Sequence, residues 1–378
     1  MRIIAHLDMD AFFASLEEAG SPIFKGLPIA VGSDPKGGLG RGVISTANYK
    51  AREYGIHSAL PISEAWRLSQ KAKAEGKPEV VFLPVDFERY NKASAQVLEI
   101  IRKHAKIMEP ASIDEFYFDL SYSAPLGRDC ALGWKKAEVI CKKIKKEIKD
   151  KLKVTCSVGI GSNKLIAKIA AGTKKPDGLV IAEEGQEGKF LELMPIRELP
   201  GIGPKTEEKL NQQGIKIIKD VRKFSREDLY DLLGKWGLDL YLKARGIDDS
   251  PLEENREAKS IGEQATFQHD TLNFIYIGEV FDNLCKSVFK RFLQSGFKTF
   301  KTVGITVRFS DFETKTTAKT LKKETKNEKE FTIEALKLLL PYLDKRKNPH
   351  KKLIRLIGVK MSCLSADREK LNNQNILI

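Results

Sequence analysis

Residues 2–19 read RIIAHLDMDAFFASLEEA, and in this stretch a strand pattern directly precedes a helix pattern. Residues 2–9 alternate and are rich in residues that favour strands, whereas residues 11–19 have the spacing of a short helix. Two acidic residues, Asp8 and Asp10, stand where the two patterns meet. The stretch therefore predicts a mixed domain of sheet and helix, with a candidate polar site at the junction.

The segments after this junction continue the mixed pattern. Residues 21–78 are rich in Gly and Pro, contain short strands and helices, and are expected to form a small inserted subdomain. Beyond the insertion we expect the order helix, strand, strand, helix, strand over residues 87–105, 106–112, 116–121, 137–148 and 154–160. This order predicts an α+β fold, with an antiparallel-containing sheet and helices on one of its faces.

The C-terminal half contains a helical segment and a second mixed domain. Residues 195–245 have a helical pattern interrupted by Gly, and residues 253–259 are charged and almost without apolar side chains, as expected of an exposed linker. We then predict strands at 264–269, 302–309, 315–321 and 354–361, and helices at 278–294 and 329–342. These elements are enough for a second α+β domain.

The composition indicates a globular protein that binds an acidic partner. The chain has 378 residues, with 65 Lys or Arg against 51 Asp or Glu, so its formal net charge is +14. At about 150 residues per domain this length predicts two to four domains. The positive excess favours a polyanion such as nucleic acid. No stretch approaches about 18 apolar residues, so no interaction with a membrane is expected.

The cysteines indicate a reducing compartment. All five are widely separated and no CxxC pair is present, which disfavours both a disulfide framework and a zinc site. Asp8 and Asp10 also interrupt any signal-peptide core. A cytoplasmic location is therefore predicted.

Asp8, Asp114 and Glu115 form the first candidate site. Asp114 and Glu115 occupy the predicted turn of a β-hairpin, where they converge only if the turn redirects one of the two side chains. Convergent carboxylates repel one another, and Mg²⁺ or Mn²⁺ relieves that repulsion through oxygen ligands. Two such ions about 3.5 to 4 Å apart can activate an attacking oxygen and stabilise a leaving one in phosphoryl transfer. The alternative is that these acids simply cap the sheet edge in water.

Thr46, Tyr49 and Arg52 form a second candidate site, for a triphosphate. They are three residues apart, so Tyr49 and Arg52 would share one face of a helix that begins near Thr46. A hydroxyl, a phenol and a guanidinium can all bind phosphate oxygens, and Arg does so in a bidentate manner. Lys175 lies at a turn and, alone, is equally compatible with a solvated side chain. The Gly-rich segment 34–42 is not a P-loop, because it lacks the GK[ST] ending.

Residues 199–213 indicate binding to a DNA backbone. The sequence LPGIGPKT at 199–206, followed by a helical stretch, is a helix-hairpin-helix pattern. Gly201 and Gly203 allow close approach to a phosphate, and free N–H groups at the helix start beside Lys205 bind the anion without sequence preference. The alternative is an ordinary Gly-rich connection between helices. Further basic residues lie on or beside the C-terminal strands, at Lys298, Lys301, Arg308, Lys315 and Lys319.

Four stretches together resemble the Y-family translesion DNA polymerases, and the DNA polymerase IV type is the nearest branch. They are residues 7–13, 43–52, 111–115 and 159–168, which follow one another in the family's order. The resemblance implies a right hand of ferredoxin-like palm, small fingers and helical thumb, joined to an α+β little finger. The implied modules are a palm at 1–20 and 79–180, fingers at 21–78, a thumb at 181–248, a linker at 249–259, a little finger at 260–365 and a tail at 366–378.

The resemblance also implies the metal-binding residues. Asp8, Asp114 and Glu115 match the family's catalytic carboxylates, which hold two Mg²⁺ ions. The backbone carbonyl of Met9 would complete one coordination shell. Asp10 matches a position that is not a usual metal ligand.

On the nucleotide side, the resemblance assigns dNTP binding to Thr46, Tyr49, Arg52 and Lys175. Phe13 matches the steric gate, whose ring occupies the space that a ribose 2′-hydroxyl needs. Phe12 is grouped with it at the dNTP, although core packing is its favoured role. Val43 and Ser45 match the small residues that roof the nascent base pair, and a small roof weakens selection by shape.

The implied activity is template-directed, low-fidelity DNA synthesis across lesions, which transfers dNTPs to a primer 3′-hydroxyl without proofreading. The implied partners are primer–template DNA and dNTPs, with the protein acting as a monomer. A sliding clamp is expected only from the family likeness, because residues 374–378 contain Gln374 and aliphatic residues but no aromatic pair. A catalytically silent DNA-damage-binding scaffold and a two-metal nuclease are the alternatives.

Overall fold

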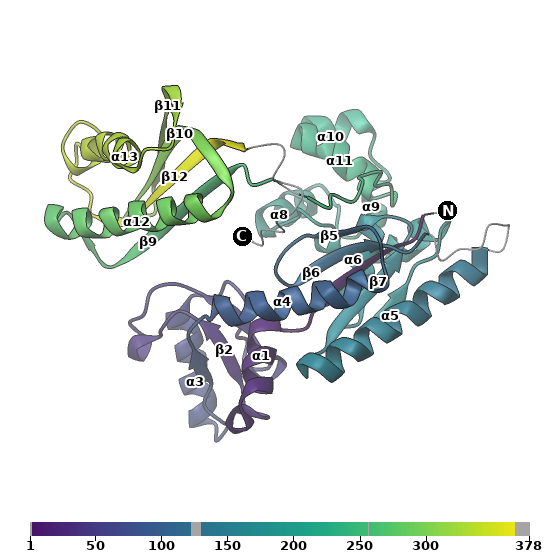
Figure 1. The fold of residues 1–378 in the computed structure, drawn as a ribbon. Coiled ribbons are helices and arrows are strands. Elements are labelled where there is room, and N and C mark those ends of the chain that lie inside the picture. Colours follow the sequence, from purple (N-terminus) through teal and green to yellow (C-terminus); the bar gives the residue numbers. More distant parts are fainter. Residues whose placement is uncertain (1, 122–129, 256, 367–378) are drawn as a thin grey trace. The chain divides into compact units, whose positions relative to one another are not determined.

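The computed structural model of the protein describes residues 2–121, 130–255 and 257–366 (Figure 1). Its elements form two compact units, one of Met1–Gly38 with Val43–Glu254 and the other of Leu39–Gly42 with Asn255–Ile378. In the described ranges, no helix has the length and apolar character needed to cross a membrane.

The first unit begins with β1 (Ile4–Met9) and α1 (Phe12–Gly20), which confirms the strand and helix predicted from residues 2–19. The next elements are η1 (Pro22–Phe24), β2 (Ile29–Gly32), η2 (Lys36–Gly38), β3 (Ile44–Ala47), α2 (Tyr49–Arg52), α3 (Ile62–Ala74) and β4 (Val81–Leu83). They are followed by α4 (Phe87–Arg102), β5 (Met108–Pro110), β6 (Glu115–Asp119), α5 (Cys130–Leu152), β7 (Cys156–Gly161), α6 (Lys164–Thr173) and β8 (Leu179–Ile181). The unit ends with α7 (Glu187–Leu191), η4 (Ile196–Glu198), α8 (Pro204–Gln212), α9 (Ile218–Val221), α10 (Arg226–Leu233) and α11 (Lys235–Lys243).

A five-stranded sheet in the order β5-β6-β1-β7-β8 forms the centre of this unit. The strand β1 lies in the middle and pairs antiparallel with both β6 and β7, whereas β7 and β8 are parallel. Helices pack on both faces of the sheet at this central strand, which explains why β1 is almost entirely apolar apart from His6 and Asp8. The predicted α+β fold with antiparallel strands is therefore confirmed.

Helices cover both faces of this sheet. Leu7, Met9 and Val158 point to one face and share a core with α4 and α5. Alternate residues point the other way, and there α6 lies against the sheet at Gly159 and Gly161. A Cβ at Gly159 would lie 2.1 Å from the carbonyl oxygen of Ala167, so the helix backbone approaches where only glycine fits. The prediction of helices on one face is wrong for α6, because these two glycines create a second packing surface.

The predicted inserted subdomain has its own sheet, in the order β3-β2-β4, and its own small apolar core. The strand β4 pairs in parallel with β2, so this sheet includes residues up to Leu83. The helices α7 to α11 share an apolar core to which α6 contributes Leu165, Ile166 and Ile169. The helical segment is thus anchored on the helix that covers the second face of the large sheet.

The second unit is another α+β layer. It contains β9 (Ser260–Thr271), α12 (Phe274–Gln294), β10 (Phe297–Phe309), β11 (Thr314–Thr325), α13 (Glu328–Leu343) and β12 (Ile354–Ala366). The four strands form an antiparallel sheet in the order β11-β10-β12-β9, and α12 and α13 pack on one face over a shared core. The predicted second α+β domain is confirmed, with every strand longer than expected.

Candidate active site

Asp8 and Glu115 lie opposite each other in paired strands. Asp8 in β1 is the cross-strand partner of Glu115, the first residue of β6. Directly opposed residues project from the same face of a sheet. The N–H of Met9 donates to the carbonyl of Asp114 at 3.0 Å, which holds the turn before β6 against the end of β1. The predicted hairpin with acids at its turn is therefore present, and it places all three acids at one end of β1.

Lysines from two other segments compensate these carboxylates. Lys175 pairs with Asp8, and Lys168 of α6 pairs with Glu115. The nearby ring of His6, with Nε2 3.6 Å from Oε2, and the ammonium of Lys168 hold the pKa of Glu115 at about 2. Burial raises the pKa of Asp8, and the ammonium of Lys175 opposes that shift. The site is thus a partly buried cluster in which two lysines compensate two of the three carboxylates.

The donor atoms suit a hard divalent cation. Oxygen atoms of three carboxylates and one adjacent carbonyl are the ligands that Mg²⁺ and Mn²⁺ prefer. In the described part of the chain, however, no three His, Cys, Asp or Glu side chains are arranged to hold a metal ion. The reason is local, because Asp8 and Glu115 are engaged by lysines and Asp114 accepts a hydrogen bond from the hydroxyl of Ser112. The backbones of the three acids are nevertheless neighbours at one end of β1.

His6 and Lys168 are parts of this cluster that the sequence interpretation missed. His6 is fully buried and packs against Tyr117 with centroids 4.4 Å apart and ring planes inclined by 55°. Among the described residues, neither of its ring nitrogens has a partner within hydrogen-bond distance. Burial lowers the pKa of His6. A signal for it was available, because His6 is two residues before Asp8 and so shares its face of the strand.

The predicted triphosphate residues lie together on β3 and α2. Thr46 is in β3, and Tyr49 and Arg52 share the short helix α2, whose start is capped by Asn48. The guanidinium of Arg52 stacks over the Tyr49 ring at 4.7 Å, and its Nε donates to the carbonyl of Ala47 at 2.9 Å. The Tyr49 hydroxyl is buried and has no hydrogen-bond partner in the described structure. Burial raises the pKa of Tyr49 to about 12, so the phenol is a donor at neutral pH.

The two phenylalanines of α1 have different surroundings. Phe12 is 1% exposed and belongs to the main core, in agreement with its favoured packing role. Phe13 is 9% exposed and stacks on Tyr90 of α4. Val43 is 47% exposed and Ser45 is half-buried, on either side of the buried Ile44. Because alternate strand residues share a face, Val43 and Ser45 present a small surface together.

The helix-hairpin-helix pattern forms a glycine-rich turn before α8. Gly201 has a φ of +100°, where L-residues other than glycine are strained, and Gly203 is the N-cap of α8. No side chain caps this helix, and Pro204 occupies its first turn. Lys205 is exposed beside these N–H groups. The turn therefore has the open, positive helix start that phosphate binding requires.

The sheet register places the basic residues of the second unit on two different faces of the sheet. Arg308 is opposite Thr314 and donates to its hydroxyl at 2.8 Å, on the face away from α12 and α13. Lys315 and Lys319 are opposite Val307 and Val303, which belong to the core, so these lysines lie on the helix-covered side. Lys319 pairs there with Glu334 of α13. The open face instead includes Lys360, opposite Gly304, which the sequence interpretation missed.

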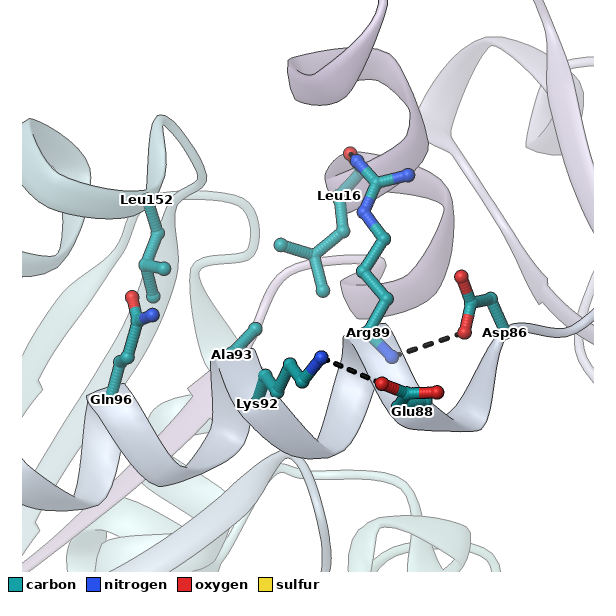
Figure 2. Close-up of a pocket in the computed structure, with 8 residues that line it drawn as sticks. All are labelled: Leu16, Asp86, Glu88, Arg89, Lys92, Ala93, Gln96 and Leu152. Carbon is teal, nitrogen blue, oxygen red and sulfur yellow. Dashed lines mark hydrogen bonds and ion pairs between the residues drawn. The ribbon is translucent and has the colours of Figure 1, made fainter.

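The cavity shown in Figure 2 is separate from these residues. It has a volume of about 420 Å³ and is lined by α1, α4 and the end of α5. Arg89 in its wall binds Glu17 at 2.8 Å, and Lys92 binds Glu88 at 2.7 Å. None of the predicted site residues lines it.

Comparisons with protein families match most of the chain. The model described as "impB/mucB/samB family" matches residues 7–172, and its C-terminal domain model matches residues 258–374. The model described as "DNA polymerase-iota, thumb domain" matches residues 197–248.

Similar proteins were found among curated sequences and solved structures. The chain is 39% identical to DNA polymerase IV 2 of Methanosarcina mazei over 100% of this chain and 95% of that protein. It is 36% identical to DNA polymerase IV of Streptococcus agalactiae over 98% of this chain and 96% of that protein. A Y-family DNA polymerase chimera has a TM-score of 0.80 at 27% identity, covering 97% of this chain and 100% of its own. The insertion ternary complex of Dbh DNA polymerase has a TM-score of 0.65 at 26% identity, with the same coverage.

Proposed function

This chain belongs to the Y family of DNA polymerases, in the DNA polymerase IV group, and we propose that the cluster around Asp8 is its polymerase active site. The protein is a translesion DNA-directed DNA polymerase, which uses DNA and dNTPs and depends on divalent metal. The observation that carries the site assignment is the pairing of Asp8 with Glu115 across β1 and β6, with Asp114 in the adjoining turn.

Asp8, Asp114, Glu115 and the carbonyl of Met9 are proposed to hold two Mg²⁺ ions, for which Mn²⁺ can substitute. When bound, such ions stabilise the attacking and leaving oxygens of phosphoryl transfer as Lewis acids. The reaction joins the primer 3′-hydroxyl to the α-phosphorus of the dNTP, and pyrophosphate leaves. Lys175, which pairs with Asp8 in the free protein, would exchange that carboxylate for the triphosphate.

Thr46, Tyr49 and Arg52 are proposed to bind the triphosphate together with Lys175. The unpartnered Tyr49 hydroxyl is a protonated donor, which suits a phosphate oxygen. The stacking of Arg52 on the Tyr49 ring orients a planar guanidinium, and oriented guanidinium groups bind phosphate in a bidentate manner. Phe12 is too deeply buried for its ring to contribute, so any contact of Phe12 with dNTP would be through its backbone.

Phe13 is proposed to exclude ribonucleotides, and Val43 and Ser45 to roof the nascent base pair. The stacked position of Phe13 supports the first role, because a ring packed against Tyr90 cannot move away from a 2′-hydroxyl. The small exposed surface at Val43 and Ser45 supports the second role, since it offers little steric selection against a damaged base. Low fidelity follows from the same surface, and we expect no proofreading.

Gly201, Gly203 and Lys205 are proposed to bind the DNA backbone at the thumb, and Arg308 to do so on the open face of the little finger. The uncapped start of α8 supports the first contact. The small residues on the open face of the second sheet support its role as a DNA surface. Thr302, Gly304 and Thr306 lie there in one row with Arg308. Neither contact reads base sequence.

We propose the modules with the predicted boundaries, with the palm, the thumb and the fingers except residues 39–42 in the first unit, and the little finger in the second. The inclusion of β4 in the small sheet supports extending the fingers to Leu83.

A monomer acting in the cytoplasm is proposed as well, and Cys141, Cys156, Cys285 and Cys363 are free thiols. The clamp-binding prediction falls on residues 374–378, which lie outside the described residues.

Primer extension by wild type and Asp114→Asn, on an undamaged template and on one with an abasic site, tests this assignment. The variant should be slower by about a thousandfold or more, since loss of a metal ligand removes several kcal/mol of transition-state stabilisation. Asp119→Asn, at the far end of β6, is the control and should extend at the wild-type rate. Equal extension by Asp114→Asn and wild type would contradict the site, and extension of neither template by wild type would contradict the activity.

A further inference from the structure

Asp10 has a buried carboxylate whose two oxygens are both engaged. Its exposed fraction is 1%. Oδ1 accepts from the hydroxyl of Ser157 at 2.8 Å, and Oδ2 accepts from the hydroxyl of Thr155 and from the N–H of Asp177, each at 2.8 Å. Three converging donors require an acceptor-only group, which an ionised carboxylate is. Both oxygens of Asp10 are thus engaged by Thr155, Ser157 and Asp177.

The bond from Asp177 connects Asp10 to the turn that contains Lys175. Asp177 has a φ of +57°, in the left-handed region that Asp tolerates. Gly178 follows, and a Cβ there would lie 1.8 Å from the carbonyl oxygen of Lys174, so the turn closes tightly on itself. The N–H of Gly178 also donates to the hydroxyl of Ser157 at 3.3 Å. Because that hydroxyl donates to Asp10, the turn is linked to Asp10 a second time.

Lys145 of α5 secures the other side of this turn. Its Nζ donates to Asp177 Oδ1 at 2.8 Å and to the carbonyl of Gly178 at 3.1 Å. The turn is thus held by both Asp10 and Lys145, which bind Asp177, two residues after Lys175. Lys175 itself reaches Asp8.

We propose that Asp10 is a positioning residue, which fixes the turn at 174–178 and thereby sets Lys175 for its exchange between Asp8 and the incoming triphosphate. The inference rests on the proposed triphosphate role of Lys175. Asp10 itself touches neither substrate nor metal. A flexible lysine has a large rotamer entropy. A turn held at two points therefore reduces the conformational entropy that is lost when Lys175 binds dNTP.

A double-mutant cycle tests this role with Asp10→Asn, Lys175→Ala and the combined variant. Single-turnover primer extension measures the dNTP Kd and the maximum rate separately. Lys175→Ala should raise the dNTP Kd about tenfold, since a hydrogen bond to a charged group is lost. Asp10→Asn should raise it about fivefold, because the amide presents an NH₂ group to one of three donors. If Asp10 acts through Lys175, the combined variant should match Lys175→Ala within about twofold. Multiplication of the two effects, to about 50-fold, would overturn the inference and leave the polymerase assignment intact.

Hydrogen exchange of the peptide containing Asp177 gives a readout that is independent of dNTP binding. Exchange at this amide should accelerate in Asp10→Asn, and unchanged exchange would overturn the inference. Thr155→Val is the matched control, because it removes one bond to the same carboxylate but leaves the bond from Asp177. It should retain the wild-type dNTP Kd and the wild-type exchange at Asp177. A normal dNTP Kd in Lys175→Ala, in contrast, would refute the role of Lys175 in the proposed function.

Lys145→Met provides the same test if Asp10→Asn does not fold. It removes the bonds from Lys145 to Asp177 and Gly178, and also the bond to the carbonyl of Cys156, but none of the three bonds that Asp10 accepts. Its dNTP Kd should rise in the same direction, and its effect should vanish in the Lys175→Ala background. A Lys145→Met effect that persists without Lys175 would overturn the positioning role of the turn.

Discussion

The ring of Phe13 in α1 lies nearly parallel to the ring of Tyr90 in α4, with centroids 4.2 Å apart and planes inclined by 11°. Tyr90 is fully buried, and its hydroxyl donates to Glu17 at 2.7 Å. Phe87 approaches the Phe13 ring edge-on at 6.1 Å. Phe13 is therefore packed against two other aromatic side chains, Tyr90 over its face and Phe87 at right angles to it.

Replacement of Phe13 should weaken sugar discrimination. Phe13→Ala removes the ring from the proposed gate, so the ratio of dNTP to rNTP incorporation should fall by about a hundredfold, the size of a steric penalty of about 3 kcal/mol. The measurement is single-nucleotide insertion with dNTP and rNTP in parallel. An unchanged ratio would refute the gate.

Two neighbouring variants separate the gate from general packing. Phe12→Leu lies in the core and should lower stability by about 1 kcal/mol without changing the dNTP/rNTP ratio. Tyr90→Phe keeps the stacked ring and removes only the hydroxyl bond to Glu17, so it should also retain the ratio. A loss of discrimination in Phe12→Leu would assign the gate to α1 as a whole.

Metal binding should be measurable without DNA. At a Mn²⁺ concentration about ten times its Kd, the free energy of unfolding should rise by about 1.4 kcal/mol, since metal binds only the folded site. Thermal melting with and without Mn²⁺ detects this change. The gain should be absent in the Asp8→Asn/Glu115→Gln variant and retained in Asp119→Asn. A full gain in the double variant would place the metal elsewhere.

Gly203→Ala should weaken DNA binding without loss of stability. Apart from the two chain neighbours of Gly203, no heavy atom of the described residues lies within 4 Å of a Cβ placed there, and its φ of −93° suits alanine. A methyl group at the start of α8 would nevertheless obstruct a phosphate, so Kd for primer–template should rise about tenfold through loss of charge-assisted hydrogen bonds. Fluorescence anisotropy gives Kd, and thermal melting checks the fold. A normal Kd would remove this turn from the DNA surface.

Lys205→Gln should change the salt dependence of the same binding. Loss of one phosphate contact reduces the slope of log Kd against log salt concentration by about 1. Lys189→Gln, which removes the same charge from α7, is the control and should keep the wild-type slope. Equal slopes in Lys205→Gln and wild type would show that Lys205 contacts no phosphate.

Asp220 should make a pH-dependent contribution to stability. The ammonium of Lys223 and the backbone N–H groups of Ile217 and Lys216 hold its pKa at about 2, below the ordinary value of 3.8. A lowered folded-state pKa stabilises the protein above the unfolded-state value, and this stabilisation is lost as pH falls toward 2. The cost of Asp220→Ala should thus be constant at about 1 kcal/mol from pH 7 to about pH 5 and shrink below about pH 4. Urea unfolding at pH 7, 5 and 3 measures it, with Asp231→Ala as control; a pH-independent cost would contradict the assigned cause.

The elements with strong local periodicity were predictable. The strand and helix of residues 2–19 appear as β1 and α1, and the hairpin appears as β5 and β6 around the acidic turn. Each signal lies within about ten consecutive residues, because alternation and helical spacing express which side of one element is buried. The face on which α6 packs was not predictable in this way, since Gly159 and Gly161 only show that some backbone approaches them.

The orientation of single side chains required the register. Lys315 and Lys319 were grouped with Arg308 as basic residues near one sheet, and the pairing of β10 with β11 separates them onto opposite faces. A shift of one residue reverses the face of every side chain in a strand. Composition records how many lysines the strand has and contains no information about that shift.

Residue identity and spacing along the chain were sufficient to identify three carboxylates, a helix-hairpin-helix turn and a family likeness, because each of these signals is contained in a short stretch. The pairing of Asp8 with Glu115 and the ion pair of Lys175 with Asp8 could be identified only from the folded chain. Asp10 and the N–H of Asp177 are 167 residues apart in sequence and 2.8 Å apart in space. Strand order and register bring such groups together, and these are properties of the whole sheet, in which β1 contacts partners from distant parts of the chain.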